Sequence, residues 1–468
     1  MTLVRKLGAA LSAAALAAGL ALLPASPAAA ATAPLLSDFR LRTASLPAPS
    51  LQDRVNQLDA RLPKLGVQNI LLQANRAGAW ATGSSSACPV QNIFTDSATG
   101  AKALPPGRRF CWNPSDANTV GGAYEWVPQG VTTVADAQAD ELWGSRQAVL
   151  VSWYDSNHQS DDNVTKGVRV SFVDANTNQY QHVLLAYPYI SSSGGVPTWE
   201  AVTTPQSGDH GSLHAGGIVW YGNYLYVADT VQGFRVFDMR YIFDIKAAEE
   251  QGLGDTAATS TTGYNPLTGK WSSYGYRYVM PQVDWLVSDL GDYSGKDNDC
   301  SATGTPKFSS VSLDRSSGPS LITSEYCANT GGNNPTADEY GRIARWPLDS
   351  ATGLLKRDSD GKVRATAAYR SPARYIQGAT AYNGKFYLSQ TGGGENGMAQ
   401  LLEATPSNGV LSVSKARWAG IGSEDLSVWP SKSEIWTVTE FAGKRVVYTC
   451  PLAATADGTS CGGGAKVR

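Results

Sequence analysis

Short apolar segments and polar anchor residues alternate along the chain in a pattern that recurs from about residue 120 onward. Each copy has an apolar segment that opens on a polar or small residue, then a turn, then a second apolar segment that ends on an acid or an amide. The first segments open at Gln129, His214, Ser309, Gln377 and Glu424, and the second segments end at Asp155, Asp229, Glu325, Gln390 and Glu440. Segments of this length between turn residues predict β-strands, and their recurrence predicts a repeat architecture.

The fourth copy shows the repeating unit most clearly. Its pattern predicts strands over residues 377–382, 385–390, 398–403 and 411–418, with a tight turn at Asn383-Gly384. Antiparallel four-stranded units repeated around a ring form a β-propeller, so we expect an all-β propeller with five blades. The fifth copy has no obvious fourth strand, which either residues 68–74 or residues 109–112 could supply. Alternatively, residues 65–118 form part of a sixth blade.

The first 31 residues predict a secretory signal peptide. Arg5 and Lys6 precede an Ala/Leu-rich run, and small residues that suit cleavage follow at 28–31. No other segment is long and apolar enough to predict a membrane span. We therefore expect a secreted, extracellular protein that has no membrane contact after the signal is removed.

A leader with a short helix is expected over residues 32–64, before a propeller domain over residues 65–468. Residues 32–49 are rich in Ala, Pro and Ser, which predicts a flexible leader. A helix is predicted from Ser50 to Leu62, because Ser50 and Asp53 form a capping box and apolar residues recur at helical spacing. We expect this helix to pack against the outside of the propeller.

Charge and cysteine content limit the classes of function. The formal net charge is −2, and it becomes more acidic once the signal segment with Arg5 and Lys6 is removed. Nucleic-acid partners are not expected, because their binding surfaces are usually strongly basic. The 6 cysteines of an exported chain predict disulfides, and we expect sequence-local pairs, 88–111, 300–327 and 450–461. We expect a monomer.

A propeller geometry predicts where the chemistry lies. The innermost strand of each blade lines the axis, and the second strand runs back antiparallel to it, so the start of the first and the end of the second meet on one face. The ten anchor residues should then form two rings at the mouth of the axis. Buried polar groups at such positions need partners, so we expect a polar pocket there.

Two carboxyl groups in one pocket can divide into an acid and an ionised base. Glu424 with Glu440, or Asp229 with Glu325, could act this way in glycoside cleavage, and His214 beside Asp229 could act as an oriented base. These five are the candidate catalytic residues. The candidate substrate-binding residues are the remaining polar anchors and a histidine of the loop before the second copy, namely Gln129, Gln377, Asp155, Gln390 and His210.

Two alternatives accompany this interpretation. Acids and amides repeated at one blade position can simply tie strands together through hydrogen bonds. A ring of carboxylates and amides could instead hold Ca²⁺, and the acidic loop over residues 292–299 is a weaker calcium candidate. No other cofactor is predicted.

Two stretches resemble known propeller families. Residues 375–379 (Tyr-Ile-Gln-Gly-Ala) and 384–392 resemble the opening phrase of plant-type glutaminyl cyclases, which are five-bladed propellers that close an N-terminal glutamine. Residues 424–427 (Glu-Asp-Leu-Ser) are similar to secreted phytase-like and lactonase-like propellers. The signal and the composition resemble those of secreted actinobacterial proteins. These resemblances cover short stretches and imply no catalytic residue.

The leading hypothesis is a carbohydrate-active enzyme, a hydrolase or lyase that acts on an extracellular polysaccharide or glycoside. The axial acids and the aromatic residues of the loops motivate it. One alternative is a non-catalytic propeller that binds a glycan or a protein. Another is a cyclase-like or lactonase-like enzyme with a small-molecule substrate.

Overall fold

The computed structural model describes one compact unit within residues 31–468. The described residues are 31–82, 88, 93–95, 107–117, 126–156, 164–203, 213–295, 299–328, 340–392, 394–453 and 461. Residues 1–30 of the predicted signal peptide and His210 lie outside these residues.

Most of the described chain forms antiparallel strands in successive groups of four, which confirms the all-β prediction. The first group is β5 (Trp126–Thr133), β6 (Ala148–Asp155), β7 (Val168–Asp174) and β8 (Gln179–Ile190). The second is β10 (Ile218–Tyr221), β11 (Tyr224–Asp229), β12 (Gly233–Asp238) and β16 (Tyr278–Ser288). The third is β17 (Ser310–Asp314), β18 (Ser320–Ser324), β19 (Arg342–Pro347) and β21 (Ala367–Arg370). The fourth is β22 (Ile376–Tyr382), β23 (Lys385–Gln390), β24 (Met398–Ser407) and β25 (Val410–Ile421).

The last group is completed by a strand from the N-terminal part of the chain. β26 (Ser423–Trp429), β27 (Glu434–Thr439) and β28 (Val446–Pro451) pair in sequence, and β4 (Arg108–Cys111) then pairs antiparallel with β28. Of the two segments predicted to supply this strand, the one at 109–112 does so. Residues 67–72 instead form helix α2 (Val67–Leu72), because Val67, Ile70 and Leu71 share one buried face.

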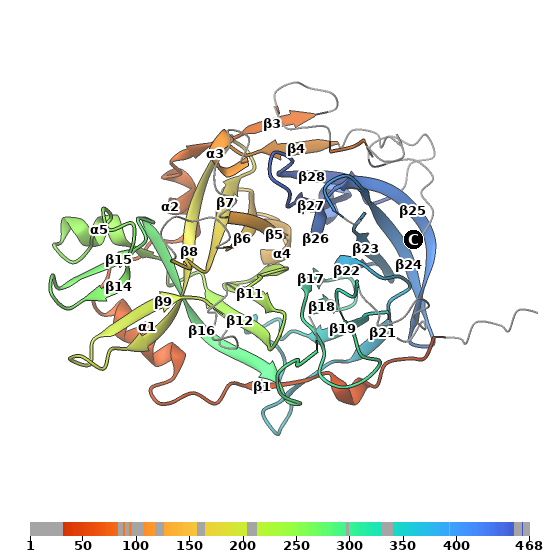
Figure 1. The fold of residues 1–468 in the computed structure, drawn as a ribbon, viewed down its shortest axis with the longest axis horizontal. Coiled ribbons are helices and arrows are strands. Elements are labelled where there is room, and N and C mark those ends of the chain that lie inside the picture. Colours follow the sequence, from red (N-terminus) through yellow and green to blue (C-terminus); the bar gives the residue numbers. More distant parts are fainter. Residues whose placement is uncertain are drawn as a thin grey trace, which may run out of the picture. The chain divides into compact units, whose positions relative to one another are not determined.

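The innermost strands of the groups contact one another in a closed circuit. β5 contacts β10, β10 contacts β17, and the contacts continue through β22 and β26 back to β5. Figure 1 shows β5, β17, β22 and β26 gathered around the centre of the domain. The buried carboxylate of Asp425 joins three groups, because its Oδ2 accepts from Val131 N and Ile218 N, each at 3.2 Å. This circuit brings together anchor residues that lie far apart in the sequence.

The other elements extend the outer edges of the groups. Short strands add to outer strands or form a hairpin, and they are β1 (Arg40–Thr43), β2 (Arg76–Ala77), β3 (Ala79–Thr82), β9 (Pro197–Ala201), β13 (Phe243–Asp244), β14 (Thr262–Asn265), β15 (Lys270–Ser273) and β20 (Val363–Arg364). The remaining helices are α1 (Leu51–Asp59), α3 (Pro114–Ala117), α4 (Val134–Ala137), α5 (Ile245–Glu250) and the 3₁₀ turns η1 (Leu36–Asp38) and η3 (Pro430–Lys432). No helix in the described part of the chain is long and apolar enough to cross a bilayer.

The N-terminal helix follows its prediction, but the leader does not. Ser50 Oγ accepts from Asp53 N at 3.2 Å, and α1 packs against β8, β9 and β16. Residues 40–43 are not a flexible leader, since β1 pairs antiparallel with β16 and β20. Leu41 is fully buried in this pairing, and a composition rich in Ala, Pro and Ser does not reveal that partner.

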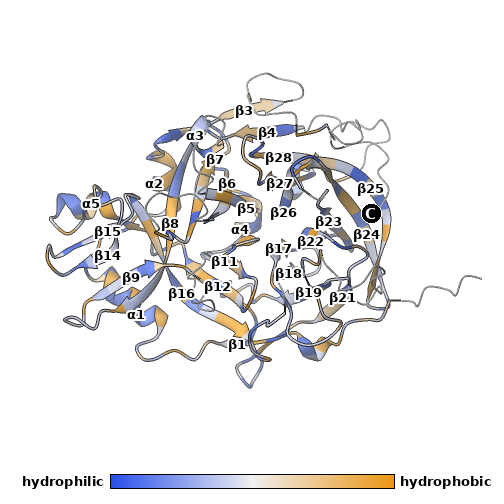
Figure 2. Ribbon diagram, in the orientation of Figure 1, coloured by the Kyte–Doolittle hydropathy of each residue, from blue (hydrophilic) through white to orange (hydrophobic). Residues whose placement is uncertain are grey.

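Packing between the groups is apolar, and disulfides hold the loops. Figure 2 shows hydrophobic residues along β7 and β16 and hydrophilic residues on the outer strand β9. The largest fully buried side chains include six tryptophans, Trp153, Trp199, Trp220, Trp346, Trp429 and Trp436. The three disulfides are Cys88–Cys111, Cys300–Cys327 and Cys450–Cys461, as predicted.

The closeness of the inner strands gives a test of the circuit. A Cβ on Gly217 would lie 2.1 Å from Val311 N of the next group, so Gly217→Ala should reduce the free energy of unfolding by about 1–3 kcal/mol. Equilibrium urea denaturation measures this loss. Gly66→Ala is the control, because a Cβ there meets nothing within 4 Å. Equal stabilities of the two variants would contradict the close packing of β10 on β17.

Candidate functional site

Two glutamate side chains meet at one end of the circuit. Glu424 lies at the start of β26 and Glu440 directly follows β27, and the register Ser423↔Thr439 sets them side by side. Their carboxyl groups are hydrogen-bonded to each other. Gln129 of β5 donates from Nε2 to Glu440 Oε2 at 3.3 Å. The structure thus brings together three anchors from two different groups.

Burial and contact decide which of the two glutamates holds a proton. Burial raises the pKa of Glu424 well above its usual range, and the adjacent Glu440 raises it further. Burial also raises the pKa of Glu440, but hydrogen bonds from Gln129 and Glu424 and the charge of Arg445 oppose this. The surroundings thus favour the protonated form of Glu424 more strongly than that of Glu440, so a proton shared by the pair rests on Glu424.

Two tyrosines lie close enough to this pair of glutamates to be affected by its charge, and two further aromatic rings contact them. Tyr154 at the end of β6 and Tyr326 just after β18 are half-buried, and burial together with the charges of the two glutamates raises the pKa of each tyrosine to about 12. Both phenols therefore remain protonated hydrogen-bond donors at neutral pH. The exposed ring of His214 lies against Tyr154 with centroids 4.7 Å apart, and Tyr375 lies 6.5 Å from Tyr326. The pair of glutamates and these four side chains form what we call the axial site.

The backbone is strained at two positions that carry this aromatic rim. Ala215, directly after His214, has φ 52°, and Tyr375 has φ 63°. Non-glycine residues rarely adopt this region, and it is a genuine outlier for a bulky residue. Such strain concentrates at functional sites, which supports a role for this rim.

Asp229 and Glu325 lie in buried ion pairs. Asp229 Oδ2 accepts from Arg235 Nε at 2.9 Å, and its Oδ1 accepts from two backbone N–H groups of the following turn. Glu325 accepts from Arg342 through both carboxylate oxygens, at 2.7 and 2.9 Å. Each carboxylate is thus held by its own arginine, which favours the strand-tying alternative over an acid–base couple.

Three other predicted residues lie at strand ends of the first and fourth groups. Asp155 is buried and its Oδ2 accepts from Lys166 N at 2.6 Å, while Gln390 donates to Arg374 O at 3.0 Å. Gln377 is half-buried at the start of β22. His210 lies outside the described residues, so its role remains a prediction.

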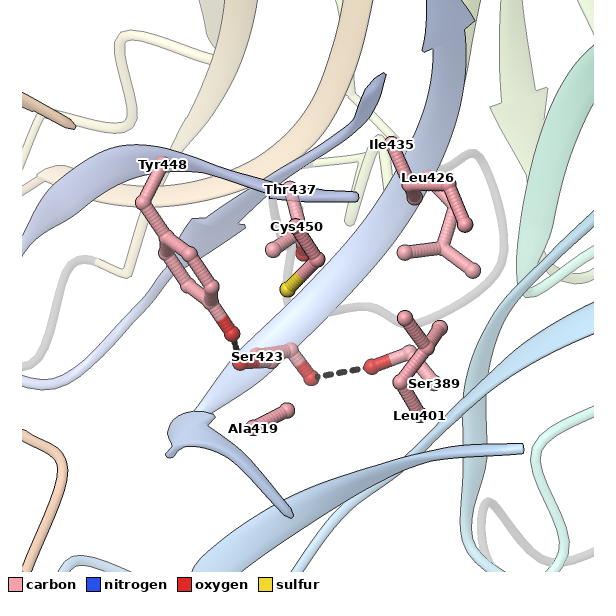
Figure 3. A pocket seen from close by; sticks show the side chains of 9 residues that line it. All are labelled: Ser389, Leu401, Ala419, Ser423, Leu426, Ile435, Thr437, Tyr448 and Cys450. Carbon is pink, nitrogen blue, oxygen red and sulfur yellow. Dashed lines mark hydrogen bonds between the residues drawn. The ribbon is translucent and has the colours of Figure 1, made fainter. Parts of the chain in front are cut away.

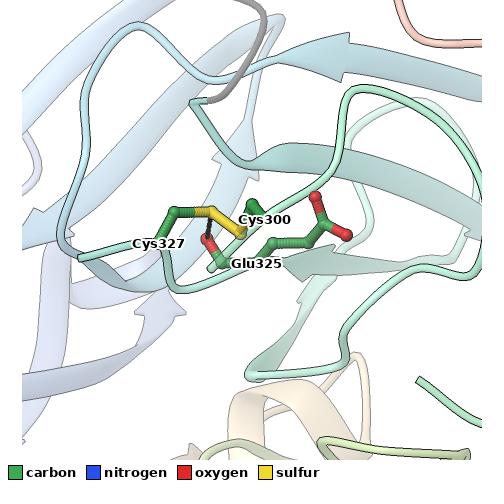
Figure 4. Close-up of side chains that lie close together, drawn as sticks. All are labelled: Cys300, Glu325 and Cys327. Atoms are coloured by element: carbon green, nitrogen blue, oxygen red, sulfur yellow. Dashed lines mark hydrogen bonds between the residues drawn. A yellow bond between two sulfur atoms is a disulfide. The ribbon is translucent and has the colours of Figure 1, made fainter. Parts of the chain in front are cut away.

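The described residues bring together one cluster with metal-ligand chemistry, Cys300, Glu325 and Cys327. Figure 4 shows that the two cysteines form a disulfide beside Glu325. A disulfide sulfur is a poor metal ligand, and Glu325 already binds Arg342, so this cluster does not fit a cation. Calcium at the axis or in the 292–299 loop remains a prediction.

A small enclosed cavity lies between the fourth and fifth groups. Its lining comes from β23 to β28, and Figure 3 shows Ser423 joined to both Ser389 and Tyr448 by hydrogen bonds. All of its lining residues are buried. We interpret it as a packing gap that is separate from the axial site.

Sequence reasoning did not single out the tyrosines or Arg445. Tyr154 and Tyr326 each adjoin a polar anchor at a second-strand end, and Tyr375 stands two residues before an anchor of a first strand. This recurrence of tyrosine beside the anchors was the available signal. Nothing in the sequence reveals that Arg445 binds the backbone carbonyl of Glu440.

Comparisons with known proteins give distant likenesses. No family model matches the chain, and no curated protein matches it. A family 43 arabinoxylan arabinofuranohydrolase from Bacillus subtilis is similar at 12% identity and a TM-score of 0.31, over 73% of this chain and 67% of that one. A GH43_1 enzyme from Xanthomonas citri has 9% identity and a TM-score of 0.32, over 72% and 90%. An exo-β-1,3-galactanase from Phanerochaete chrysosporium has 10% identity and a TM-score of 0.32, over 80% and 65%. These likenesses assign neither a family nor an activity.

The protonation of Glu424 predicts a pH-dependent effect on stability. Because the pKa of Glu424 is higher in the folded chain than in the unfolded chain, the folded state loses stability as pH rises above the ordinary glutamate range. Glu424→Gln keeps a neutral donor to Glu440 and removes this loss. We expect unchanged stability at about pH 4 and a gain of at least about 1 kcal/mol at about pH 8, measured by urea denaturation.

Glu325→Gln is the control at the second-strand end of the third group, where the buried acid pairs with an arginine. It removes the closer of the two anionic partners of the buried Arg342 and leaves Asp38 at 3.3 Å, so we expect a loss of about 1–3 kcal/mol at both pH values. A similar loss for Glu424→Gln at both pH values would show that Glu424 is an ordinary structural anion.

Proposed function

We propose that this protein is a secreted, five-bladed β-propeller enzyme that acts on a glycan at the axial site. Five groups of four antiparallel strands and the closed circuit of inner strands support the propeller and its blade number. Three disulfides are typical of exported chains. The signal-like first 31 residues support secretion.

The observation that carries the proposal is a proton-sharing pair of glutamates inside an aromatic rim. Tyrosine and histidine rings offer flat apolar faces with polar edges, which suits the faces and hydroxyl groups of sugar rings. The pair supplies a base, Glu440, and an acid, Glu424, at the same place. Sugar recognition and acid–base chemistry thus coincide.

This pair could hydrolyse a glycosidic bond in a simple sequence. Glu440 takes a proton from a water molecule whose oxygen bonds to the anomeric carbon. Glu424 gives its proton to the glycosidic oxygen as the bond between that oxygen and the anomeric carbon breaks. The two carboxyl groups end with one shared proton, now on Glu440, and exchange with solvent restores the starting form.

The close contact of the two carboxyl groups also favours a second candidate. In most glycosidases the two groups stand about 5–9.5 Å apart, so that they flank the scissile bond. Here they are hydrogen-bonded to each other. A propeller that binds a glycan without cleaving it needs no such separation, and the aromatic rim would serve it equally well.

Turnover separates the two candidates. The purified protein is incubated with a panel of neutral and acidic polysaccharides, and released reducing ends or unsaturated products are quantified. We expect turnover on at least one substrate, and Glu440→Gln and Glu424→Gln should each lower kcat at least about 100-fold. Glu403→Gln is the control, because Glu403 pairs with Lys385 on the β23–β24 pair away from the axial site. Absence of turnover by the wild type, with binding that depends on the rim, would favour the binding propeller.

The aromatic rim has its own prediction. His214 is exposed and stacks on Tyr154, so His214→Ala removes a stacking face without opening the core. We expect KM, or the dissociation constant of a bound glycan, to rise about three- to tenfold with kcat nearly unchanged. Steady-state kinetics or calorimetry measures it. A large fall in kcat would instead make His214 a catalytic base, as the sequence suggested.

A further inference from the structure

An arginine recurs opposite the acid at the end of the second strand. Arg342 lies directly opposite Glu325, and Arg445 lies at the equivalent place opposite Glu440. In the first two groups the arginine stands farther along the third strand, where Arg235 faces Val227 and Arg169 faces Trp153. Such arginines are placed to neutralise the acids at the mouth of the axis.

Two of these arginines pair with the acid of their own group. The other two, Arg169 and Arg445, are diverted to another partner. Arg235 binds Asp229, and Arg342 binds Glu325. Arg445 instead donates from Nε to the backbone carbonyl of Glu440 at 2.9 Å and from Nη1 to the backbone carbonyl of Asp116 at 3.3 Å. The carboxylate of Glu440 is thereby left to Glu424 and Gln129.

Asp116, on the short segment α3, is the residue to which both diverted arginines connect. Its carboxylate accepts from Arg169 Nη2 at 2.8 Å, and it also contacts Tyr180, His182 and Arg76. Gly443 N donates to Ala117 O at 2.9 Å, which fixes α3 against the loop that carries Arg445. Asp116 is 6% exposed, so this anchor is interior.

The serine–histidine–aspartate line in this cluster is structural. Burial lowers the pKa of His182 to about 3, so the ring is neutral. Its Nδ1 then accepts from Ser171 Oγ at 2.9 Å, and its Nε2 donates to Asp116. Ser171 is fully buried and also accepts from Trp153 Nε1, so its hydroxyl is used as both donor and acceptor within the first group.

We propose that Arg445, held by Asp116 and α3, is a positioning residue that keeps Glu440 as the ionised partner of the pair without pairing with its carboxylate. Besides Arg445, the groups that act on Glu440 are Glu424, Gln129 and the charge of Glu395, and Tyr154 and Tyr326 feel its charge. Arg445 is the cation in this set, and its charge lowers the pKa of Glu440. The importance of Arg445 for catalysis rests on the proposed function, but the test of its effect on Glu440 does not.

The test follows the protonation of the pair directly. The mature chain is labelled with ¹³C at glutamate side-chain carboxyls, and the signals of Glu424 and Glu440 are assigned from their glutamine variants. Titration by NMR then gives the two pH values at which the pair takes up its protons, and the one at lower pH is called the lower step. Because an opposite charge is lost, Arg445→Gln should move the lower step up by about one pH unit, whereas Arg445→Lys should move it by less than half as much.

Asp116→Asn provides a second variant with the opposite sign. Loss of the anion beside Arg445 makes the surroundings of Glu440 more positive, so the lower step should move down. A general loosening of the fold would not move the lower step up in Arg445→Gln and down in Asp116→Asn. Arg240→Gln, which breaks the pair between the exposed Arg240 and the buried Asp238 of the second group, is the control and should leave both steps unchanged.

The outcomes are distinguishable from those for the proposed function. An unchanged lower step in Arg445→Gln, equal shifts in Arg445→Gln and Arg445→Lys, or an upward shift in Asp116→Asn would each overturn the positioning role. If Arg445→Gln does not fold, Asp116→Asn alone decides by the sign of its shift. A protein without turnover whose pair titrates as expected would refute the enzyme and leave the positioning role standing.

Discussion

The inner strands approach one another at backbone contact distance, and the rest of the structure depends on this closeness. A Cβ on Gly216 would lie 2.1 Å from Ser309 O, and one on Gly378 would lie 2.7 Å from the Cα of Asp425. Side chains therefore have little room between the inner strands at these levels. Polar chemistry is confined to the end of the circuit, where the first strands begin and the second strands end.

At that end, equivalent positions carry similar residues with different partners. Asp229 and Glu325 each bind a buried arginine, whereas Glu440 at the equivalent place binds Glu424. A buried anion beside an arginine is neutralised and inert. Two carboxyl groups in contact without an arginine between them favour a bound proton, because burial and the neighbouring carboxylate both raise the pKa. The difference in partners, rather than the acids themselves, distinguishes the axial site from the strand ties of other groups.

One N-terminal stretch serves both the fold and the site. Residues 108–111 form β4 on the outer edge of the fifth group, and α3, a few residues later, anchors Arg445 and Arg169. Closure of the fifth group and the electrostatics of Glu440 are therefore linked through a short piece of chain. Asp116, on α3 between β4 and the first group, carries the buried charge of this link.

The sequence by itself determined the strands, the turns and the positions of the polar anchors. Period, turn residues and cysteine spacing are local properties, so the Asn383-Gly384 turn, the capped helix and the local disulfides followed from them. Only the tertiary structure decided which anchors meet each other and which meet an arginine. Those partners lie on different strands and, for Asp116 and Arg445, 329 residues apart. The charge state of each anchor acid depends on such contacts and on burial, and the residue spacing within one segment predicts neither of them.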